Sequence, residues 1–213
     1  MKKVILIIIM IMFGSILGAQ ECGPLCPVCS GSSEGALVAR QSFIFTSMYI
    51  PGSDEEKGLL NLKYGVNSWL DIGLGYSVIE KKLIWNARVQ LIKEDEEGWR
   101  PGIIAGNGSV QTGGSDQSVY INLSKSFEFT EDFAMRITTG IAGLLPDMNK
   151  VYGLFGLTFS FKDKFSIFTS FDGITFHEGV SWVVNDWFSL SALLIESKYP
   201  AISAGIKWSI SNK

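Results

Sequence analysis

The clearest feature of the sequence is an alternation of apolar and polar side chains that persists from residue 37 almost to the C-terminus. Segment 70–78 places Leu70, Ile72 and Leu74 at every second position, and segments 83–91 and 202–210 repeat this spacing. Successive side chains of a β-strand point to opposite faces, whereas residues at a spacing of two wind around a helix and leave no coherent stripe. The pattern therefore predicts strands with one apolar and one polar face, and little helix.

Turn-forming residues divide the alternating region into about twelve segments of roughly ten residues each, which is typical of membrane barrels. The expected strands are 37–50, 58–66, 69–79, 83–92, 101–110, 118–126, 133–145, 151–161, 165–172, 174–184, 187–196 and 200–211. We therefore predict an all-β fold, an antiparallel up-and-down transmembrane β-barrel of about 12 strands that follows a short irregular N-terminal segment.

Aromatic residues flank every second connection between the predicted strands. This set of connections is bordered by Trp69, Trp99, Phe129, Phe133, Phe161, Phe165 and Trp187. Aromatic rings prefer the interface between membrane and water, so a belt at one end of successive hairpins indicates one rim of a barrel in a bilayer. An even number of strands would place both chain ends at this same rim, on the periplasmic side.

Composition agrees with a compact strand-rich fold and argues against one class of partner. Apolar residues make up 46% of the chain and charged residues 18%, and the 23 glycines and 12% aromatic residues suit strands joined by tight turns. The net charge of -3 gives no electrostatic footprint for binding nucleic acid.

The first residues have the features of an export signal. Lys2 and Lys3 precede an apolar run over 4–13, and Ala19 is a small residue suitable for cleavage. The run is shorter than the roughly 18 residues that a spanning helix needs. We therefore expect a cleaved signal peptide at 1–19, a Cys-rich periplasmic or plug segment at 20–35, and an outer-membrane barrel at 36–213. Glu21, directly before Cys22, argues against a lipoprotein.

A soluble β-sandwich or lipocalin-like barrel would also show alternation, but its apolar face would fill the interior. Here the positions opposite the bulky apolar rows carry many small residues and a few charges of both signs, namely Gly73, Gly75, Ser77, Gly140, Ala142, Gly156, Thr158 and Ser160 together with Asp71, Arg88 and Arg136. This mixture suits a narrow polar interior better than a soluble outer surface, where Lys and Glu would be abundant.

Two hairpin sequences, 64–74 and 184–190, resemble those of small Gram-negative outer-membrane β-barrel proteins of the porin-like or exopolysaccharide-export-associated type. Ser203, Gly205, Trp208 and Ile210 are similar to the C-terminal signal that the barrel-assembly machinery reads, although the chain continues to Lys213 without a terminal Phe. The resemblance implies an outer-membrane location in a Gram-negative bacterium, contact with outer-membrane lipid and insertion by that machinery, but no particular solute.

The three cysteines, Cys22, Cys26 and Cys29, all lie just after the expected cleavage site. One interpretation is a single disulfide plus a thiol that pairs with another chain in an oxidising compartment. The other is a metal or redox role, because closely spaced thiolates converge on one ion, with His177 as a distant fourth ligand. Ser30 stands where a c-type haem site needs a histidine.

Alternation directs eleven polar side chains toward the barrel interior. These candidates for lining the lumen are Lys63, Asp71, Asn86, Arg88, Gln90, Asn107, Asn122, Arg136, Asp172, His177 and Lys207. Since burying charges is costly unless they pair, one interpretation is a neutralising network that only satisfies the interior. The other makes the same residues a selectivity lining for a small polar solute.

The sequence thus leaves several functions open. The first is a narrow channel, or an envelope- or export-associated barrel. The alternative is a non-conducting structural or interaction protein whose N-terminal Cys segment docks a periplasmic partner or binds metal. An outer-membrane hydrolase is a third, but the single histidine has no recognisable Ser or Cys nucleophile, so we expect no enzyme activity and no cofactor.

Overall fold

The computed structural model describes residues 37–52, 58–95, 98–109, 117–146 and 150–210. These ranges contain no helix long and apolar enough to cross a membrane. Their regular structure consists of twelve strands, β1 (Ser42–Tyr49), β2 (Gly58–Asn67), β3 (Leu70–Ser77), β4 (Lys82–Ile92), β5 (Gly102–Gly108), β6 (Ser118–Thr130), β7 (Phe133–Leu144), β8 (Val151–Phe161), β9 (Phe165–Phe171), β10 (Phe176–Asn185), β11 (Phe188–Ile195) and β12 (Tyr199–Ser209).

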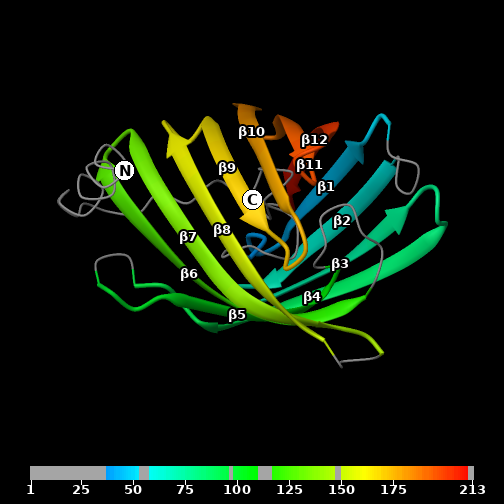
Figure 1. The fold of residues 1–213 in the computed structure, drawn as a ribbon. Coiled ribbons are helices and arrows are strands. Elements are labelled where there is room, and N and C mark those ends of the chain that lie inside the picture. Colours follow the sequence, from blue (N-terminus) through cyan, green and yellow to red (C-terminus); the bar gives the residue numbers. More distant parts are fainter. Residues whose placement is uncertain (1–36, 53–57, 96–97, 110–116, 147–149, 211–213) are drawn as a thin grey trace, which may run out of the picture.

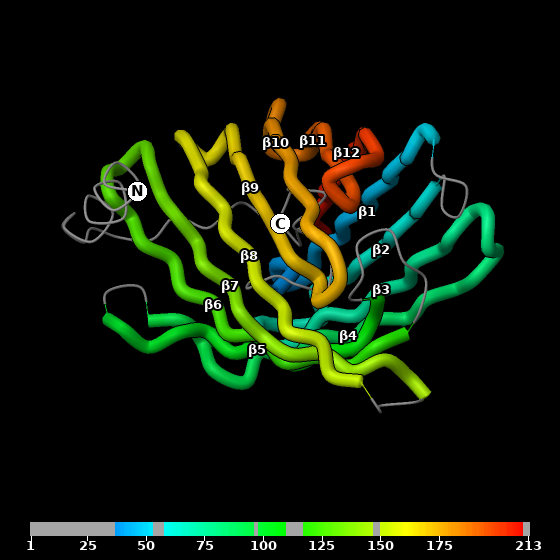
Figure 2. The backbone as a smooth tube through the Cα atoms, viewed as in Figure 1, coloured from blue at the N-terminus to red at the C-terminus, as the bar shows by residue number. Residues whose placement is uncertain are grey.

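The strands form one closed antiparallel barrel in which each strand pairs with its neighbours in the sequence. The first and last strands complete the wall, with Ser42 opposite Ser209 and Tyr49 opposite Ile202. Figure 1 shows this wall with β7, β8 and β9 in front of β1, β2 and β3, and the tube in Figure 2 follows the long neighbouring strands β6 to β8 around it. The predicted twelve-stranded up-and-down barrel is confirmed.

The two ends of the barrel differ in what they carry. The terminal rim, as we call it, holds the start of β1, the end of β12 and the connections at 68–69, 93–101, 131–132, 162–164 and 186–187. The far rim holds the connections at 50–57, 78–81, 109–117, 145–150, 172–175 and 196–198. The aromatic residues singled out in the sequence border the connections of the terminal rim.

The two faces of the wall have opposite polarity. All six tryptophans of the sequence lie on the outside or at the rims, each with at least 44% of its surface exposed. The interior, by contrast, holds charged groups that are almost completely buried, including Asp71 at 0% and Arg88 at 2% exposure. Relative to a soluble protein the barrel is therefore inverted, with large apolar side chains outside and ionisable groups inside.

The interior also contains apolar side chains, which the sequence analysis did not predict. Ile50, Phe168, Leu193, Ile195 and Ala201 form a buried cluster toward the far rim. Phe168, Leu193 and Ala201 belong to the inward positions of β9, β11 and β12, so this cluster fills part of the barrel near that end. A second buried cluster, Tyr120, Ala142 and Leu154, lies at inward positions of β6, β7 and β8, so the interior contains two apolar regions beside the polar ones.

One predicted strand begins later than expected. Residues 37–41 were assigned to the first strand, but β1 starts at Ser42. Gln41 has a positive φ of 55°, which breaks the extended chain, and Arg40 makes a parallel bridge to Gly65 of β2. The chain thus turns at the terminal rim, and residues 37–40 form a short strap against the inner face of β2.

Candidate functional site in the barrel interior

A charged group formed by Lys63, Asp71, Asn86 and Arg88 lies on the inner face of β2, β3 and β4. Arg88 Nε donates to Asp71 Oδ1 at 3.0 Å, and Arg88 Nη2 donates to Asp71 Oδ2, so the guanidinium grips the carboxylate with two nitrogens. Such a two-point contact orients both groups and offsets part of the cost of burying them. Two cations and one carboxylate meet here.

The strap at residues 37–40 reaches the same carboxylate. The backbone N–H of Val38 donates to Asp71 Oδ2 at 2.9 Å, and Val38 itself is 4% exposed. Gly65 permits this approach, because a Cβ at that position would lie 2.1 Å from the carbonyl oxygen of Ala39. Asp71 therefore fixes both Arg88 and the strap at the terminal rim.

Inward glycines make room for the long polar side chains. Gly73 lies between Lys63 and Asn86, and an added Cβ would lie 2.8 Å from Lys63 Cγ and 2.7 Å from Asn86 Oδ1. Gly140 lies opposite Asn122, and an added Cβ there would meet Asn122 Oδ1 at 2.0 Å. These long side chains therefore lie flat across the neighbouring strand instead of projecting into the middle of the barrel.

A second charged group surrounds Glu94, which lies in the connection after β4 at the terminal rim. Glu94 Oε1 accepts a hydrogen bond from the backbone N–H of Ser126 and lies 3.4 Å from Lys125 Nζ. Glu94 Oε2 lies 3.7 Å from Arg136 Nη2, and Arg136 Nε donates to Ser126 Oγ at 2.8 Å. The Glu94 carboxylate thus accepts a hydrogen bond from a backbone N–H of β6 beyond Ser124, the last residue of β6 that pairs with β5 at this rim.

The single histidine belongs to a third group at the far rim. His177 is 1% exposed, and its Nδ1 accepts a hydrogen bond of 3.0 Å from the backbone N–H of Glu196. A neutral ring must then carry its hydrogen on Nε2, which donates to Asp172 Oδ2 at 2.9 Å. Both ring nitrogens are occupied, so the ring has no basic nitrogen available as a proton acceptor.

Asp172 in turn organises the connection between β9 and β10. Its Oδ1 accepts from the backbone N–H groups of Ile174 and Thr175, each at 3.0 Å. Burial acts to raise the pKa of Asp172, but the hydrogen bonds from His177, Thr175 and Ile174 outweigh it and hold this pKa below its ordinary value. Through His177 the same carboxylate also links this connection to the β11–β12 turn.

A row of serines crosses the inner face of five consecutive strands. Ser160, Ser166, Ser181, Ser191 and Ser203 are direct cross-strand partners from β8 to β12. Their hydroxyl groups bond to one another or to backbone oxygens: Ser191 Oγ lies 2.9 Å from Ser181 Oγ, and Ser203 Oγ donates to the carbonyl oxygen of Ser47 at 2.8 Å. The serine row itself is polar but uncharged.

The other predicted lining residues divide into two sets. Gln90, Asn122 and Lys207 follow the inward alternation of β4, β6 and β12, with Asn122 only 1% exposed. The prediction that Asn107 faces the interior is wrong. Its cross-strand partners Ala87 and Val119 alternate with the inward residues Arg88 and Tyr120, so Asn107 and both partners face outward.

The outward Asn107 has a clear structural reason. Its Oδ1 accepts from the backbone N–H of Ala87 at 2.8 Å, and its Nδ2 donates to the carbonyl oxygen of Trp85 at 3.4 Å. β5 ends at Gly108, so the Asn107 side chain serves the backbone of β4 where the partner strand stops. Alternation alone did not reveal this role.

Two further features of the interior were missed at the sequence level. Alternation assigns no face to Glu94, which lies in a connection between predicted strands, and the members of the serine row are far apart in sequence. Cys22, Cys26 and Cys29 lie outside the described residues. Within the described part of the chain, no group of three His, Cys, Asp or Glu residues is arranged to hold a metal ion.

Comparison with known proteins identifies a shared fold. A solved structure described as KdgM porin superimposes with a TM-score of 0.54 at 11% identity, covering 80% of this chain and 99% of that one. Two structures of the outer membrane protein OmpT of Vibrio cholerae, a loop L8 deletion mutant and the in-vitro folded protein, give TM-scores of 0.32 and 0.34 at 15% and 10% identity; they cover 78% and 81% of this chain, and 75% and 99% of their own. No family model and no curated protein matches the chain.

Proposed function

We propose that this protein is an outer-membrane β-barrel that acts as a narrow channel for a small polar solute. The observation that carries the proposal is the inverted polarity of the wall: tryptophans cover the outside, and buried charges lie inside. An outer surface of this kind is stable in hydrocarbon and would aggregate in water. The barrel fold shared with KdgM porin supports the same reading.

The aromatic residues support a membrane position as well. Trp69, Trp99, Phe161, Phe165 and Trp187 are each at least 40% exposed and border the terminal rim. A belt of this kind matches the level of the lipid head groups. On this proposal the N-terminal signal directs export, the barrel-assembly machinery inserts the chain, and the terminal rim faces the periplasm of a Gram-negative bacterium.

The barrel interior supports conduction of small solutes only. Twelve strands lie between the eight that leave room for side chains alone and the 16 to 18 that enclose a wide aqueous channel. In the described residues the interior is polar over β2 to β4 and along the serine row, and apolar near Phe168 and near Tyr120. These features fit a restricted polar passage that excludes large solutes.

A non-conducting barrel with a structural or docking role is the competing function. It would use the same wall, and its partner would bind the Cys22 to Cys29 segment or a metal held by it. Conduction distinguishes the two functions, because a docking protein needs no continuous passage.

Two measurements test the proposal in sequence. Detergent-extracted protein should migrate differently on a gel before and after heating, because a closed barrel resists the detergent until it is heated. Purified protein in planar bilayers should then give discrete conductance steps. Lys207→Glu reverses a charge on the inner face and should shift the reversal potential in a salt gradient toward cations.

The matched control is Lys162→Glu. Lys162 lies in an exposed turn with 72% of its side chain accessible, so the same charge change there should leave the reversal potential unchanged. Absence of the gel shift would contradict the membrane barrel. A gel shift without any conductance would contradict the channel and favour the docking function.

A further inference from the structure

The turn between β11 and β12 has a backbone geometry that its own residues do not favour. Glu196 and Ser197 both have positive φ, 55° and 51°, and the Lys198 N–H donates to the carbonyl oxygen of Ile195 at 3.0 Å. This is a two-residue type I′ turn, which prefers Asn-Gly, and a left-handed conformation is unfavourable for Glu and Ser. The turn therefore depends on bonds to neighbouring groups.

Hydrogen bonds from Glu196 and Ser197 join this turn to β10. The Glu196 backbone N–H donates to His177 Nδ1 at 3.0 Å. Ser197 Oγ lies 3.3 Å from the carbonyl oxygen of Phe176 and 2.9 Å from Glu178 Oε1, and its single hydrogen is shared between these acceptors. The imidazole thus accepts the bond that fixes the backbone of the turn.

The bond from Glu196 requires a neutral ring. Nδ1 of His177 is then the acceptor, and Nε2 carries the hydrogen that Asp172 accepts at 2.9 Å. In an imidazolium both nitrogens are donors, so Nδ1 can take up a proton only when the Glu196 N–H moves away. The bond to Asp172 persists as an ion pair and compensates the positive charge. A proton on His177 therefore opposes the attached turn but not the β9–β10 connection.

Asp172 is the charged group that faces the imidazole. Among the described residues, no other charged side chain forms a hydrogen bond or an ion pair with the ring, and its cross-strand partner on β9 is a serine. Glu178 lies on the outer face of β10, and Glu196 and Lys198 of the turn are exposed. Since histidine is the side chain that ordinarily changes charge between pH 5 and 8, His177 is the group that can respond to pH here.

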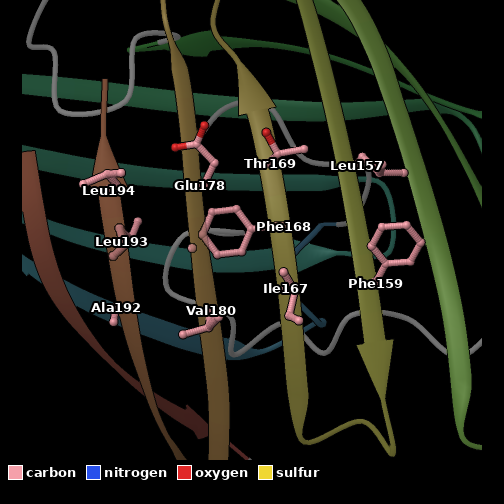
Figure 3. Close-up of a pocket in the computed structure, with 11 residues that line it drawn as sticks. Leu157, Phe159, Ile167, Phe168, Thr169, Glu178, Val180, Ala192, Leu193 and Leu194 are labelled. Atoms are coloured by element: carbon pink, nitrogen blue, oxygen red, sulfur yellow. The ribbon is translucent and has the colours of Figure 1, made fainter. Parts of the chain in front are cut away.

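The turn also borders the apolar region near the far rim. Ile195 precedes it and belongs to the buried cluster with Phe168 and Leu193, and Tyr199, which follows it, packs against the same cluster. The ring of Phe168 lies over β10 at Gly179, where the glycine leaves room for it. Figure 3 shows this ring over β10, with Leu193 on the neighbouring strand β11. Movement of the turn therefore disturbs one side of this apolar region.

We propose that acidification of the external medium releases the β11–β12 turn from β10 by protonating His177. The released state binds one proton more than the attached state, so it is favoured as the pH falls. The inference rests on the proposed membrane orientation, which places the far rim on the external side. On the proposed function, release of the turn frees one side of an apolar region that narrows the passage.

Hydrogen exchange of backbone amides, resolved by NMR of the protein in detergent micelles, tests the release. The protection factors of the Glu196 and Lys198 amides are measured between pH 8 and pH 5 and corrected for the pH dependence of exchange in an unfolded chain. Both should fall by roughly tenfold from pH 7.5 to pH 5.5, because a released histidine gains its proton in this range. The Lys164 amide, which donates within the matching turn between β8 and β9, is the internal reference and should keep its protection.

Two variants assign the effect to one group. His177→Asn cannot gain a proton, so protection at Glu196 and Lys198 should no longer change with pH. Glu178→Gln removes the other ionisable group that is bonded to the turn, and it should respond as the wild type does.

Three results would overturn the proposal. The first is constant protection in the wild type, and the second is a pH response that survives in His177→Asn or disappears in Glu178→Gln. The third is a fall at Glu196 without a fall at Lys198, because one hydrogen bond would then be lost while the turn stayed in place.

The heat-dependent gel shift keeps the two proposals distinguishable. The exchange measurement needs no conductance, so a preserved shift with constant protection contradicts the release alone. Loss of the shift in the wild type contradicts the membrane barrel on which the release rests. Each variant is compared only if it retains the shift.

Discussion

At the scale of single residues, the interior follows the rule that buried charges need partners. Asp71 accepts from Arg88 and from the backbone of Val38, and Glu94 lies within 4 Å of both Lys125 and Arg136. Removing one member of such a group leaves another charge buried, which costs more than the pair contributes. The same reasoning makes Asp172 the residue whose loss should be easiest to detect as a function of pH.

Asp172→Asn should lower the stability of the barrel by roughly 1 to 3 kcal/mol at neutral pH, because it removes the charge from three hydrogen bonds. The folded state lowers the pKa of Asp172 below its ordinary value of 3.8. Its contribution is therefore complete above about pH 4 to 5 and is lost as the pH falls through the lowered pKa. The difference between wild type and variant should shrink in this acid range.

Urea unfolding in lipid vesicles, followed by tryptophan fluorescence between pH 7 and pH 3, measures this difference. Asp186→Asn, which changes an exposed aspartate in the β10–β11 turn, is the control and should have little effect. A difference between wild type and Asp172→Asn that stays constant down to pH 3 would show that the charge of Asp172 does not stabilise the fold.

At the scale of elements, the hairpin turn between β8 and β9 has an unusual composition for its geometry. Lys162 and Asp163 both have positive φ, 50° and 53°, and Lys164 N–H donates to the carbonyl oxygen of Phe161 at 3.1 Å. This is a two-residue type I′ turn, which strongly prefers Asn-Gly. Replacing Lys162 and Asp163 together by Asn and Gly should stabilise the barrel by about 1 kcal/mol.

The same vesicle unfolding assay measures the gain. Asn-Gly at 131–132, in the β6–β7 connection, is the control, because neither Glu131 nor Asp132 has a positive φ in the structure. Equal stabilisation by both replacements would mean that the gain does not come from the geometry of the turn.

The elements also show what alternation can and cannot predict. Ten of the eleven predicted interior residues lie at inward positions or, as with Asp172, directly after a strand, because a period of two fixes the face once one residue is assigned. Asn107 differs because β5 ends beside it and its amide serves the backbone of β4. Alternation predicted a strand over the strap at 37–40, because the turn that follows the strap depends on a long-range fit to Gly65, which local sequence does not encode.

At the scale of the whole molecule, the closed sheet explains why the interior groups come from distant parts of the sequence. The serine row joins β8 to β12, and the strap reaches Asp71 across 33 residues. Strand count and face were predictable from pattern and turns. Which inward residues become neighbours depends on the register between strands, and neither the Glu94 group nor the bond between His177 and the β11–β12 turn could be derived without it.

Closure of the sheet depends on the seam between β1 and β12, and a disulfide across it tests the whole architecture. Ser47 and Ala204 are direct cross-strand partners at outward positions. Opposed residues of antiparallel strands have Cα atoms about 4.5 to 5.5 Å apart, within the range a disulfide needs. In a background with Cys22, Cys26 and Cys29 changed to Ser, the pair Ser47→Cys and Ala204→Cys should therefore oxidise within one chain.

Mass spectrometry of the digested, folded protein should detect the peptide that joins the two strands, and reduction should remove it. The control pair, Ser47→Cys with Ala192→Cys, places its second cysteine on β11, two strands away from β1, so no link should form within the folded barrel. If the seam pair failed to oxidise, or oxidised only between chains, β1 and β12 would be free edges. An open sheet could not separate a polar interior from lipid, because free edges leave backbone groups unpaired in hydrocarbon.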